Sequence, residues 1–178
     1  MFRLSELGAQ PLSKVDDNGS NGLISIYGRT NISSFRLNAS LTEHNLRYLY
    51  GRNVYQLKIP VSSFKARNNL IEHDFLQMIN AASYPEIVIF IPASAFESAE
   101  TINVEIEVAG KSVEKGISTK IISPPGSENK EIRGETSINW QELGLQPPRR
   151  FMGLLEIQET IFITFVLKLS LLINAVKY

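Results

Sequence analysis

The chain of 178 residues has no cysteine, one tryptophan and two histidines. Without cysteine there is no disulfide, no thiol nucleophile and no Cys-ligated zinc or iron–sulfur site. His73 directly precedes Asp74, and on a helix two adjacent side chains point about 100° apart, so this pair does not chelate a metal together. We therefore expect no metal and no cofactor, and we predict that His73 is a solvated helix residue. His44 is expected in a polar loop or at a strand edge.

Long apolar runs and clusters of one charge are also missing. The first 21 residues contain no apolar stretch of the length a secretory signal needs, about 7 to 15 residues. The most apolar segment, residues 154–176, is interrupted by Glu156, Glu159 and Lys168, so we expect core and not a membrane span. Basic and acidic residues number 18 each and are scattered, which argues against a nucleic-acid partner.

Motifs of common enzyme classes are absent too. The sequence has no G-x-S-x-G, phosphate loop, H-E-x-x-H or dinucleotide fingerprint. Glu105 and Glu107 share the wet face of an expected strand, where a solvated face is the simpler interpretation than acid–base work. We therefore expect no enzymatic activity.

Alternation of apolar and polar residues dominates what is present. In TINVEIEVAG, residues 102, 104, 106 and 108 are apolar and the residues between them are polar, which is typical of a half-buried strand. Similar patterns predict strands near 22–27, 33–39, 53–60, 86–91, 113–122, 132–140 and from 155 to 171. One segment has helical spacing instead and predicts an amphipathic helix over 70–82. About eight strands with one helix favour an all-β barrel or sandwich.

Several short motifs occur in an order that carries a resemblance. They are G-x-x-N-x-x-x-F at Gly28, Asn31 and Phe35; Ile59-Pro60-Val61 with Phe64; the run from Asn69 through Met78 to Tyr84-Pro85-Glu86-Ile87; Val108-Ala109-Gly110-Lys111; and WQELGLQPP at 140–148. In their order and spacing, over residues 22 to 172, the chain resembles the YceI-like family. Residues 1–21 are then a polar N-terminal extension and 22–178 the barrel domain.

The resemblance implies a lipocalin-like, eight-stranded antiparallel barrel whose apolar interior holds a polyisoprenoid or fatty-acyl chain. Members are mostly exported to the bacterial periplasm, so an exported or periplasmic location is expected; because no signal is visible here, a cytoplasmic location stays open. The segment ASAFESAET at 93–101 departs from the regular strand expected there. A homodimer also stays open.

The leading hypothesis is a non-catalytic protein that carries or sequesters a long apolar lipid, such as a polyisoprenoid or an isoprenoid quinone. At about 0.3 kcal/mol per heavy atom, a chain of roughly 40 carbons reaches about 12 kcal/mol without any charged anchor. Alternation selects the predicted ligand-binding residues: Phe35, Leu37, Ile59, Phe64, Phe75, Met78, Ile79, Ile106, Ile138, Trp140, Ile163 and Phe165.

Each of these predictions has an alternative. An eight-stranded barrel can also be filled by its own side chains, and it would then serve as an interaction or structural module. Phe35 is either a lining residue, aimed inward by positive φ angles at Gly28 and Asn31, or ordinary core. Phe75, Met78 and Ile79 form either a wall or lid of the cavity or plain core. Trp140 either plugs the barrel or stacks on a head group. An enzyme acting on a lipid would need a buried polar cluster that the sequence does not reveal.

Overall fold

A computed structural model describes residues 20–96, 101–126, 129–146 and 157–175. Its strands are β1 (Gly22–Arg29), β2 (Ser34–Leu41), β3 (Leu46–Leu49), β4 (Val54–Pro60), β5 (Lys65–Ala66), β6 (Glu86–Pro92), β7 (Thr101–Val108), β8 (Lys111–Ile122), β9 (Glu131–Asn139) and β10 (Thr160–Lys168). The α-helices are α1 (Asn69–Met78) and α2 (Leu169–Ala175), and the 3-10 turns are η2 (Glu43–Asn45), η3 (Val61–Ser63) and η4 (Ala93–Phe96).

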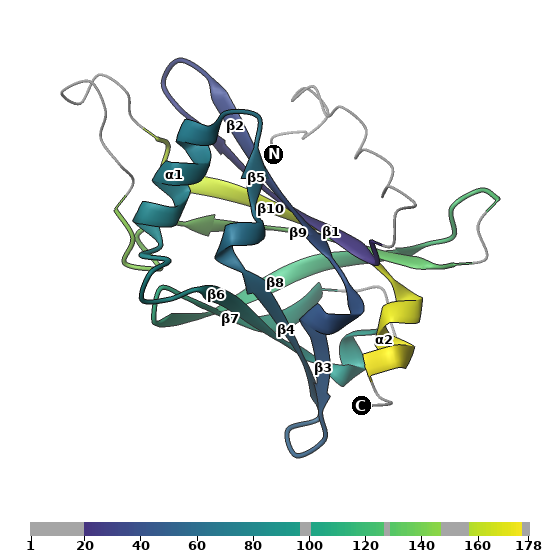
Figure 1. Ribbon diagram of the computed structural model, residues 1–178. Coiled ribbons are helices and arrows are strands. Elements are labelled where there is room, and N and C mark those ends of the chain that lie inside the picture. Colours follow the sequence, from purple (N-terminus) through teal and green to yellow (C-terminus); the bar gives the residue numbers. More distant parts are fainter. Residues whose placement is uncertain (1–19, 97–100, 127–128, 147–156, 176–178) are drawn as a thin grey trace.

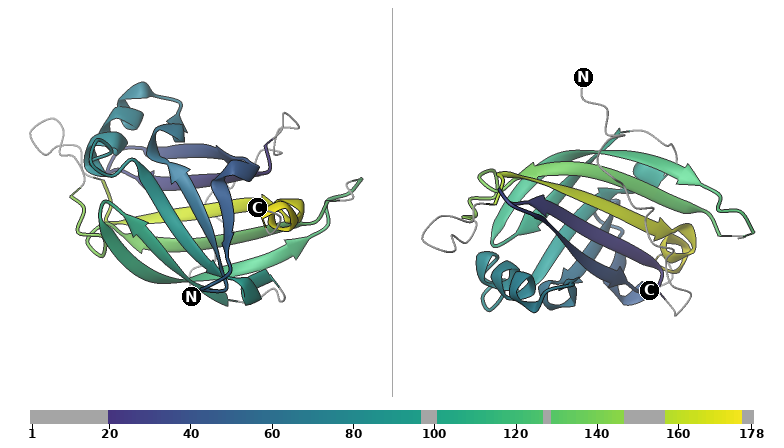
Figure 2. Two further views of the ribbon diagram at one scale, coloured as in Figure 1. Left: turned by 60° about the horizontal axis from the view of Figure 1, so that its bottom comes forward. Right: turned by 90° about the horizontal axis from the view of Figure 1, so that it is seen from above.

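All ten strands belong to one antiparallel sheet with the order β3-β4-β6-β7-β8-β9-β10-β1-β2-β5. The sheet curls into a half-barrel, with α1 at one end and α2 at the other (Figures 1 and 2). The all-β antiparallel fold with one short amphipathic helix is thus confirmed. The predicted count of eight strands is not confirmed, since the sheet has ten.

The alternation predicted from the sequence decides which face becomes the interior. On β7 the side chains of Ile102, Val104, Ile106 and Val108 are buried, whereas Glu107 between them is exposed. Because successive strand residues point to opposite faces, each strand contributes every second residue to the enclosed face. These residues form one contiguous hydrophobic core.

Two strand pairs, β3 with β4 and β2 with β5, share one register. Leu46 of β3 lies opposite Leu57 of β4, and Leu37 of β2 lies opposite Ala66 of β5. The chain runs the same number of residues from Leu46 back to Leu37 as from Leu57 forward to Ala66. No β-ladder pair joins residues 39–45 to 58–64 in this described stretch, although the Asn45 side-chain amide donates to the Lys58 carbonyl oxygen at 2.8 Å.

Gly28 is opposite Phe35 across β1 and β2, and the aromatic ring lies over the glycine. A Cβ added at Gly28 would lie 2.1 Å from Phe35 Cζ, so the ring occupies the space that any larger residue would need. Gly134 and Phe165, opposite each other on β9 and β10, repeat the arrangement. The predicted reason for Gly28 and Asn31 is therefore wrong: neither has a positive φ angle, and Gly28 provides room for the ring.

Other predicted elements differ in their boundaries. The helix predicted over 70–82 ends at Met78, and Asn80 just beyond it has a φ of 53°, a conformation that ends a helix. The strands β3 and β5 were not predicted.

The strand predicted from 155 to 171 begins at Thr160 and is replaced by helix α2 from Leu169. Alternation could not reveal this change, because Leu169, Leu171 and Leu172 suit a buried helix as well as a strand. Residues 155–156 lie outside the described part of the chain, as do 97–100 of the irregular 93–101 segment and 1–19 of the predicted extension.

None of the helices in the described ranges is long and apolar enough to cross a membrane.

Candidate functional site: an apolar interior and its mouth

An apolar cavity of ≈ 60 Å³ lies inside the curled sheet. Seven strands contribute to its wall, and the lining residues are Ile24, Ile26, Leu57, Ile87, Ile89, Ile91, Ile102, Val104, Ile106, Ile117, Thr136, Ile163, Phe165 and Leu167. Thr136 is the single polar side chain among these, and its hydroxyl donates to the Gly116 carbonyl oxygen at 3.0 Å. We call this space the inner cavity. A ligand there would contact apolar side chains, and its lining residues include no side-chain hydrogen-bonding group that lacks a partner.

A larger pocket of ≈ 260 Å³ lies between α1, the β1–β2 turn and the end of β9. We call it the mouth pocket, and its lining residues are Thr30, Ile32, Ser33, Phe35, Leu37, Asn68, Leu70, Ile71, Asp74, Phe75, Met78, Trp140 and Ile157. Ile32 is 79% exposed and Leu70 47% exposed, so apolar side chains continue from the pocket to the surface.

The two spaces are neighbours in the sheet. Leu37 lines the mouth pocket, and its direct cross-strand partner Ile26 lines the inner cavity. Cross-strand partners have Cβ atoms about 5 Å apart. The two spaces are therefore lined by adjacent residues at this point of the sheet.

Helix α1 is attached firmly where it covers the mouth. The Asn68 side chain accepts the Leu70 backbone N–H at 2.9 Å and caps the helix, as Asn does at many N-termini. The Glu72 carboxylate accepts the Ala66 backbone N–H at 2.8 Å and ties the helix to β5. On its inner side Phe75 packs against Phe64, with ring centroids 5.3 Å apart.

A turn after β9 holds Trp140 in place from both directions. The Trp140 backbone N–H donates to the Glu159 carbonyl oxygen at 2.9 Å, and the Trp140 carbonyl oxygen accepts the backbone N–H of Leu145, also at 2.9 Å. Glu142 in the same turn pairs with Lys115 of β8. The hydrogen bond from Lys115 lowers the pKa of the Glu142 carboxyl group, and a bond from the Asn139 backbone N–H lowers it further.

The predicted ligand-binding residues fall into three groups. Ile106, Ile163 and Phe165 line the inner cavity, whereas Phe35, Leu37, Phe75, Met78 and Trp140 line the mouth pocket. Ile59, Phe64, Ile79 and Ile138 are buried in the core but line neither space. All twelve belong to the hydrophobic core or pack against it; whether they bind a ligand stays a prediction.

Sequence reasoning missed most of the residues that line the two spaces, and two cases show why. Strand β6 reads EIVIFIP, and because both of its faces are apolar, alternation could not select Ile87, Ile89 and Ile91 as inward-facing. At the mouth, Asp74 is missing from the predicted set, which contains apolar and aromatic side chains only. Its spacing of four residues from Met78 places the two on one helix face, and that signal could have found it.

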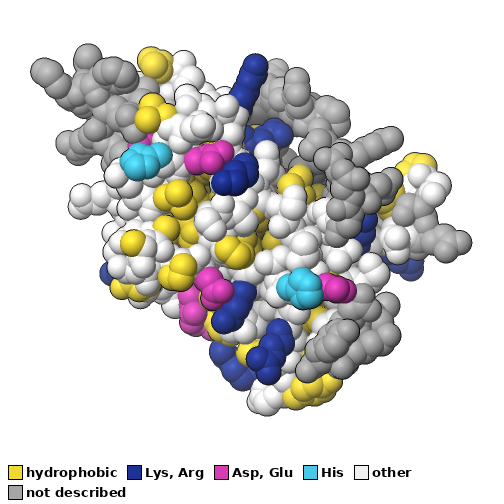
Figure 3. Space-filling view, in the orientation of Figure 1, with side chains coloured by type: hydrophobic (Ala, Val, Ile, Leu, Met, Phe, Trp, Pro, Cys, Tyr) yellow, Lys and Arg dark blue, Asp and Glu magenta, His cyan; other side chains and the backbone are white. Residues whose placement is uncertain are grey.

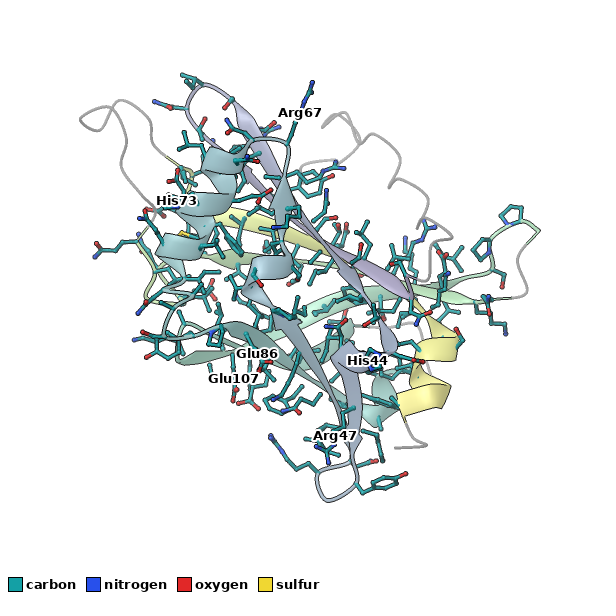
Figure 4. The ribbon with its side chains drawn as sticks, in the orientation of Figure 1. His44, Arg47, Arg67, His73, Glu86 and Glu107 are labelled. Atoms are coloured by element: carbon teal, nitrogen blue, oxygen red, sulfur yellow. The ribbon has the colours of Figure 1, made fainter. Side chains whose placement is uncertain are left out.

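Among the described residues that line the two spaces, Asp74 is the single charged one. His73 is exposed on the outer side of α1 and His44 is exposed on η2, far from it (Figure 4), so the prediction of a solvated His73 is confirmed. Arg67 projects away from the fold. On the face drawn in Figure 3, basic and acidic side chains are interspersed with small groups of hydrophobic ones. No three potential metal ligands gather within the described ranges.

No protein-family model matches the sequence, and no curated protein is similar to it in sequence. Solved structures are similar in three dimensions. A polyisoprenoid-binding domain from Saccharophagus degradans, implicated in plant cell wall breakdown, superposes with a TM-score of 0.58 over 85% of this chain and 94% of its own, at 13% identity.

The chain has the YceI-like fold. A YceI protein of Campylobacter jejuni superposes with a TM-score of 0.50 at 12% identity, over 69% of this chain and 77% of its own. BcnA of Burkholderia cenocepacia gives 0.57 at 11% identity, over 83% and 95%. The resemblance inferred from the order of short motifs is thereby confirmed at the level of the YceI-like fold, although few residues are shared.

Proposed function

We propose that the protein binds an extended apolar lipid, such as a polyisoprenoid, inside its curled sheet. The observation that carries the proposal is the combination of an inner cavity lined by apolar side chains and Thr136 with a larger pocket beside it. One of the structural neighbours is a polyisoprenoid-binding domain, which supports this ligand class. The remaining steps follow from the geometry.

The strand count of the family barrel can be reconciled with the ten strands. Strand β2 pairs with β5 and strand β3 pairs with β4, both in one register. We therefore take β2 and β3 together as one interrupted strand, and β4 and β5 together as another. The wall then has the eight strands that the resemblance implies. An eight-stranded barrel is just wide enough to hold one small ligand or to be filled by side chains. The proposal requires that the protein can change from the filled to the occupied state.

The volumes indicate how this change proceeds. A cavity of about 150 Å³ holds one benzene molecule. The mouth pocket exceeds that size, whereas the inner cavity, at ≈ 60 Å³, does not reach it. A lipid chain therefore enters at the mouth first, and the isoleucine side chains of the inner wall then move apart as the chain advances past Leu37.

We also propose that binding is not accompanied by catalysis. Among the residues that the structure describes, no charged side chain lines the inner cavity and Asp74 is the single charged one that lines the mouth pocket. No histidine stands among these described lining residues to activate a Ser or Thr hydroxyl as a nucleophile. Export to a bacterial periplasm, which the resemblance implies, is part of the proposal and is checked by cell fractionation.

A second candidate function is a filled barrel that acts as an interaction module. The small volume of the inner cavity favours it, because a centre packed to native density leaves few voids larger than a water molecule. The two candidates differ in one respect: the filled barrel neither co-purifies with a lipid nor takes one up.

Native mass spectrometry of the purified protein, followed by organic extraction and titration with geranylgeraniol, tests the proposal. We expect a bound lipid or, after extraction, saturable binding at one site. Met78→Arg, which places a charge in the mouth pocket, should weaken geranylgeraniol binding at least tenfold. Gln77→Arg, exposed on the adjacent helix position, is the matched control and should leave binding unchanged.

Equal thermal stability of the two variants shows that Met78→Arg acts on the site and not on folding. No uptake by the extracted wild-type protein would contradict the carrier hypothesis and support the filled barrel.

A further inference from the structure

Exposed apolar side chains meet at the entrance to the mouth pocket. Among the described residues, the two most exposed large aliphatic side chains are Ile32, at 79%, and Leu70, at 47%. Both line the mouth pocket. Single exposed apolar residues are common on protein surfaces. These two, however, come from separate parts of the chain, the β1–β2 turn and the start of α1, and lie at one opening.

The backbone donors of both residues have partners within the protein. In the β1–β2 turn, Thr30 Oγ1 accepts the Ile32 backbone N–H at 3.3 Å and the Ser33 backbone N–H at 2.9 Å. At the start of α1, Asn68 Oδ1 accepts the Leu70 backbone N–H at 2.9 Å. A backbone donor without a partner is costly in a phase that excludes water. Ile32 and Leu70 can therefore both enter such a phase without losing a hydrogen bond to water at their own N–H groups.

Basic side chains accompany the two apolar ones. We call residues 29–33 and 67–71 together the mouth rim. The rim contains Arg29 and Arg67, each three positions before one of the exposed aliphatic residues, and it contains no Asp or Glu. Both arginines are exposed, and Arg67 projects away from the fold (Figure 4). The mouth rim thus combines apolar side chains with positive charge.

The acidic residues that follow the rim on α1 have partners within the protein. The Glu72 carboxylate accepts the Ala66 backbone N–H at 2.8 Å and lies 3.5 Å from Lys65 Nζ, so this ion pair adds no net charge. Asp74, which lines the pocket, also has an interaction partner. The positive charge of the rim therefore comes from its two arginines.

We propose that the mouth rim docks on a membrane that contains anionic lipids, with Ile32 and Leu70 inserted between lipid molecules and the two arginines among the head groups. Apolar side chains beside basic ones favour the interface of an anionic bilayer. The rim has ten residues, fewer than the roughly 20 to 30 on each side of a stable protein–protein interface. This inference rests on the proposed function, because docking here brings an apolar lipid from the bilayer to the pocket without passage through water.

Co-sedimentation with vesicles tests the docking. Vesicles of phosphatidylglycerol and phosphatidylcholine in equal parts should bind the wild-type protein more tightly than vesicles of phosphatidylcholine alone, by about fivefold for each arginine near the surface. Ile32→Ser should weaken binding to the mixed vesicles about tenfold. Ile121→Ser is the matched control: Ile121 is exposed too, but it pairs with Ile132, at the opposite end of β9 from Trp140, and its substitution should leave binding unchanged.

Arg67→Gln separates docking from binding of the lipid itself. Arg67 is not among the described residues that line the pocket. Its substitution should therefore weaken binding to the mixed vesicles about fivefold and leave the affinity for geranylgeraniol without vesicles unchanged. Arg47→Gln is the control, since Arg47 is also exposed and lies at the opposite end of the view in Figure 4.

The outcomes distinguish this inference from the proposed function. The docking proposal is overturned if the mixed vesicles do not bind the protein, or if Ile32→Ser and Ile121→Ser weaken their binding equally. It is also overturned if light scattering shows a dimer that Ile32→Ser converts to a monomer while no vesicle binds, because the rim then joins two copies of the chain. Binding of geranylgeraniol without vesicles decides the proposed function in each case. The comparison of the two vesicle types uses the wild-type protein, so it does not depend on the folding of a variant.

Discussion

At the scale of single residues, the pairing of Gly28 with Phe35 shows why a glycine can be essential in a strand. The residue is in extended conformation, so its freedom of φ is not used, and what it provides is the space in which the Phe35 ring lies. The ring in turn lines the mouth pocket. The glycine therefore shapes a ligand-sized space without contacting it.

Gly28→Ala is expected to destabilise the protein by about 1–3 kcal/mol, the usual cost of overpacking. The added methyl group would lie 2.1 Å from Phe35 Cζ, so the ring has to move. The measurement is chemical denaturation. Gly51→Ala is the matched control, because no atom lies within 4 Å of its added Cβ, and it should be close to neutral.

Adding Phe35→Leu to Gly28→Ala should recover part of the loss, since the smaller side chain leaves room for the methyl group. An alanine at 28 that costs no more than the alanine at 51 would contradict the proposed role of the glycine.

At the scale of elements, the turn that carries Trp140 should respond to pH. Its Lys115–Glu142 pair lowers the pKa of Glu142 in the folded state. A lowered pKa means that the charged pair stabilises the fold above the unfolded-state pKa of Glu142, and that this contribution is lost as pH falls through the folded-state pKa.

We therefore expect wild-type protein to be more stable than Glu142→Gln at neutral pH, with a small difference, because exposed ion pairs contribute little. The difference should shrink toward zero in acid. Thermal unfolding of both proteins across this pH range measures it. Glu43→Gln, at an exposed position on η2, serves as control, and a wild-type advantage that persisted in acid would show that the pair is not its source.

Sequence patterns predict an element well when they identify one periodicity. Strand β7 was predicted from alternation alone, and α1 from helical spacing, because each has one apolar and one polar face. The short strands β3 and β5 have too few residues for a period to be visible. Helix α2 begins directly after Lys168, the last residue of β10, and because no Gly or Pro stands at this junction, no turn signal marks the change from strand to helix.

At the scale of the whole molecule, the interior can be predicted but its emptiness cannot. Alternation finds residues that face inward, such as Ile106 and Ile138, yet only the first lines a cavity. Whether a void remains depends on how well side chains from different strands fill the space between them. The sequence of any one strand does not contain this information. The mouth pocket is harder still, because it joins a turn, a helix and a strand end from distant parts of the chain.

Ile106→Ala and Ile138→Ala should each cost about 2–5 kcal/mol, as large-to-small core substitutions do. Their effects on ligand binding should differ. If the lipid chain occupies the inner cavity, the space opened by Ile106→Ala can be filled by ligand, and the affinity for geranylgeraniol should rise about tenfold. Ile138→Ala opens space outside both cavities and should leave the affinity unchanged.

Calorimetric titration of the two variants and the wild-type protein measures this difference. An equal response of both variants would place the ligand outside the inner cavity.

The shared register of the interrupted strands also bears on how the chain finds its fold. A slip of one residue in a sheet turns every side chain to the opposite face. The β3–β4 and β2–β5 pairs have the same register. The register that forms between β3 and β4, next to their short connection at residues 50–53, therefore already determines that Leu37 lies opposite Ala66. A register error between β3 and β4 would expose Leu57, and it would also displace Leu37 from Ala66. One register therefore applies to both strand pairs, and a wrong register destabilises both.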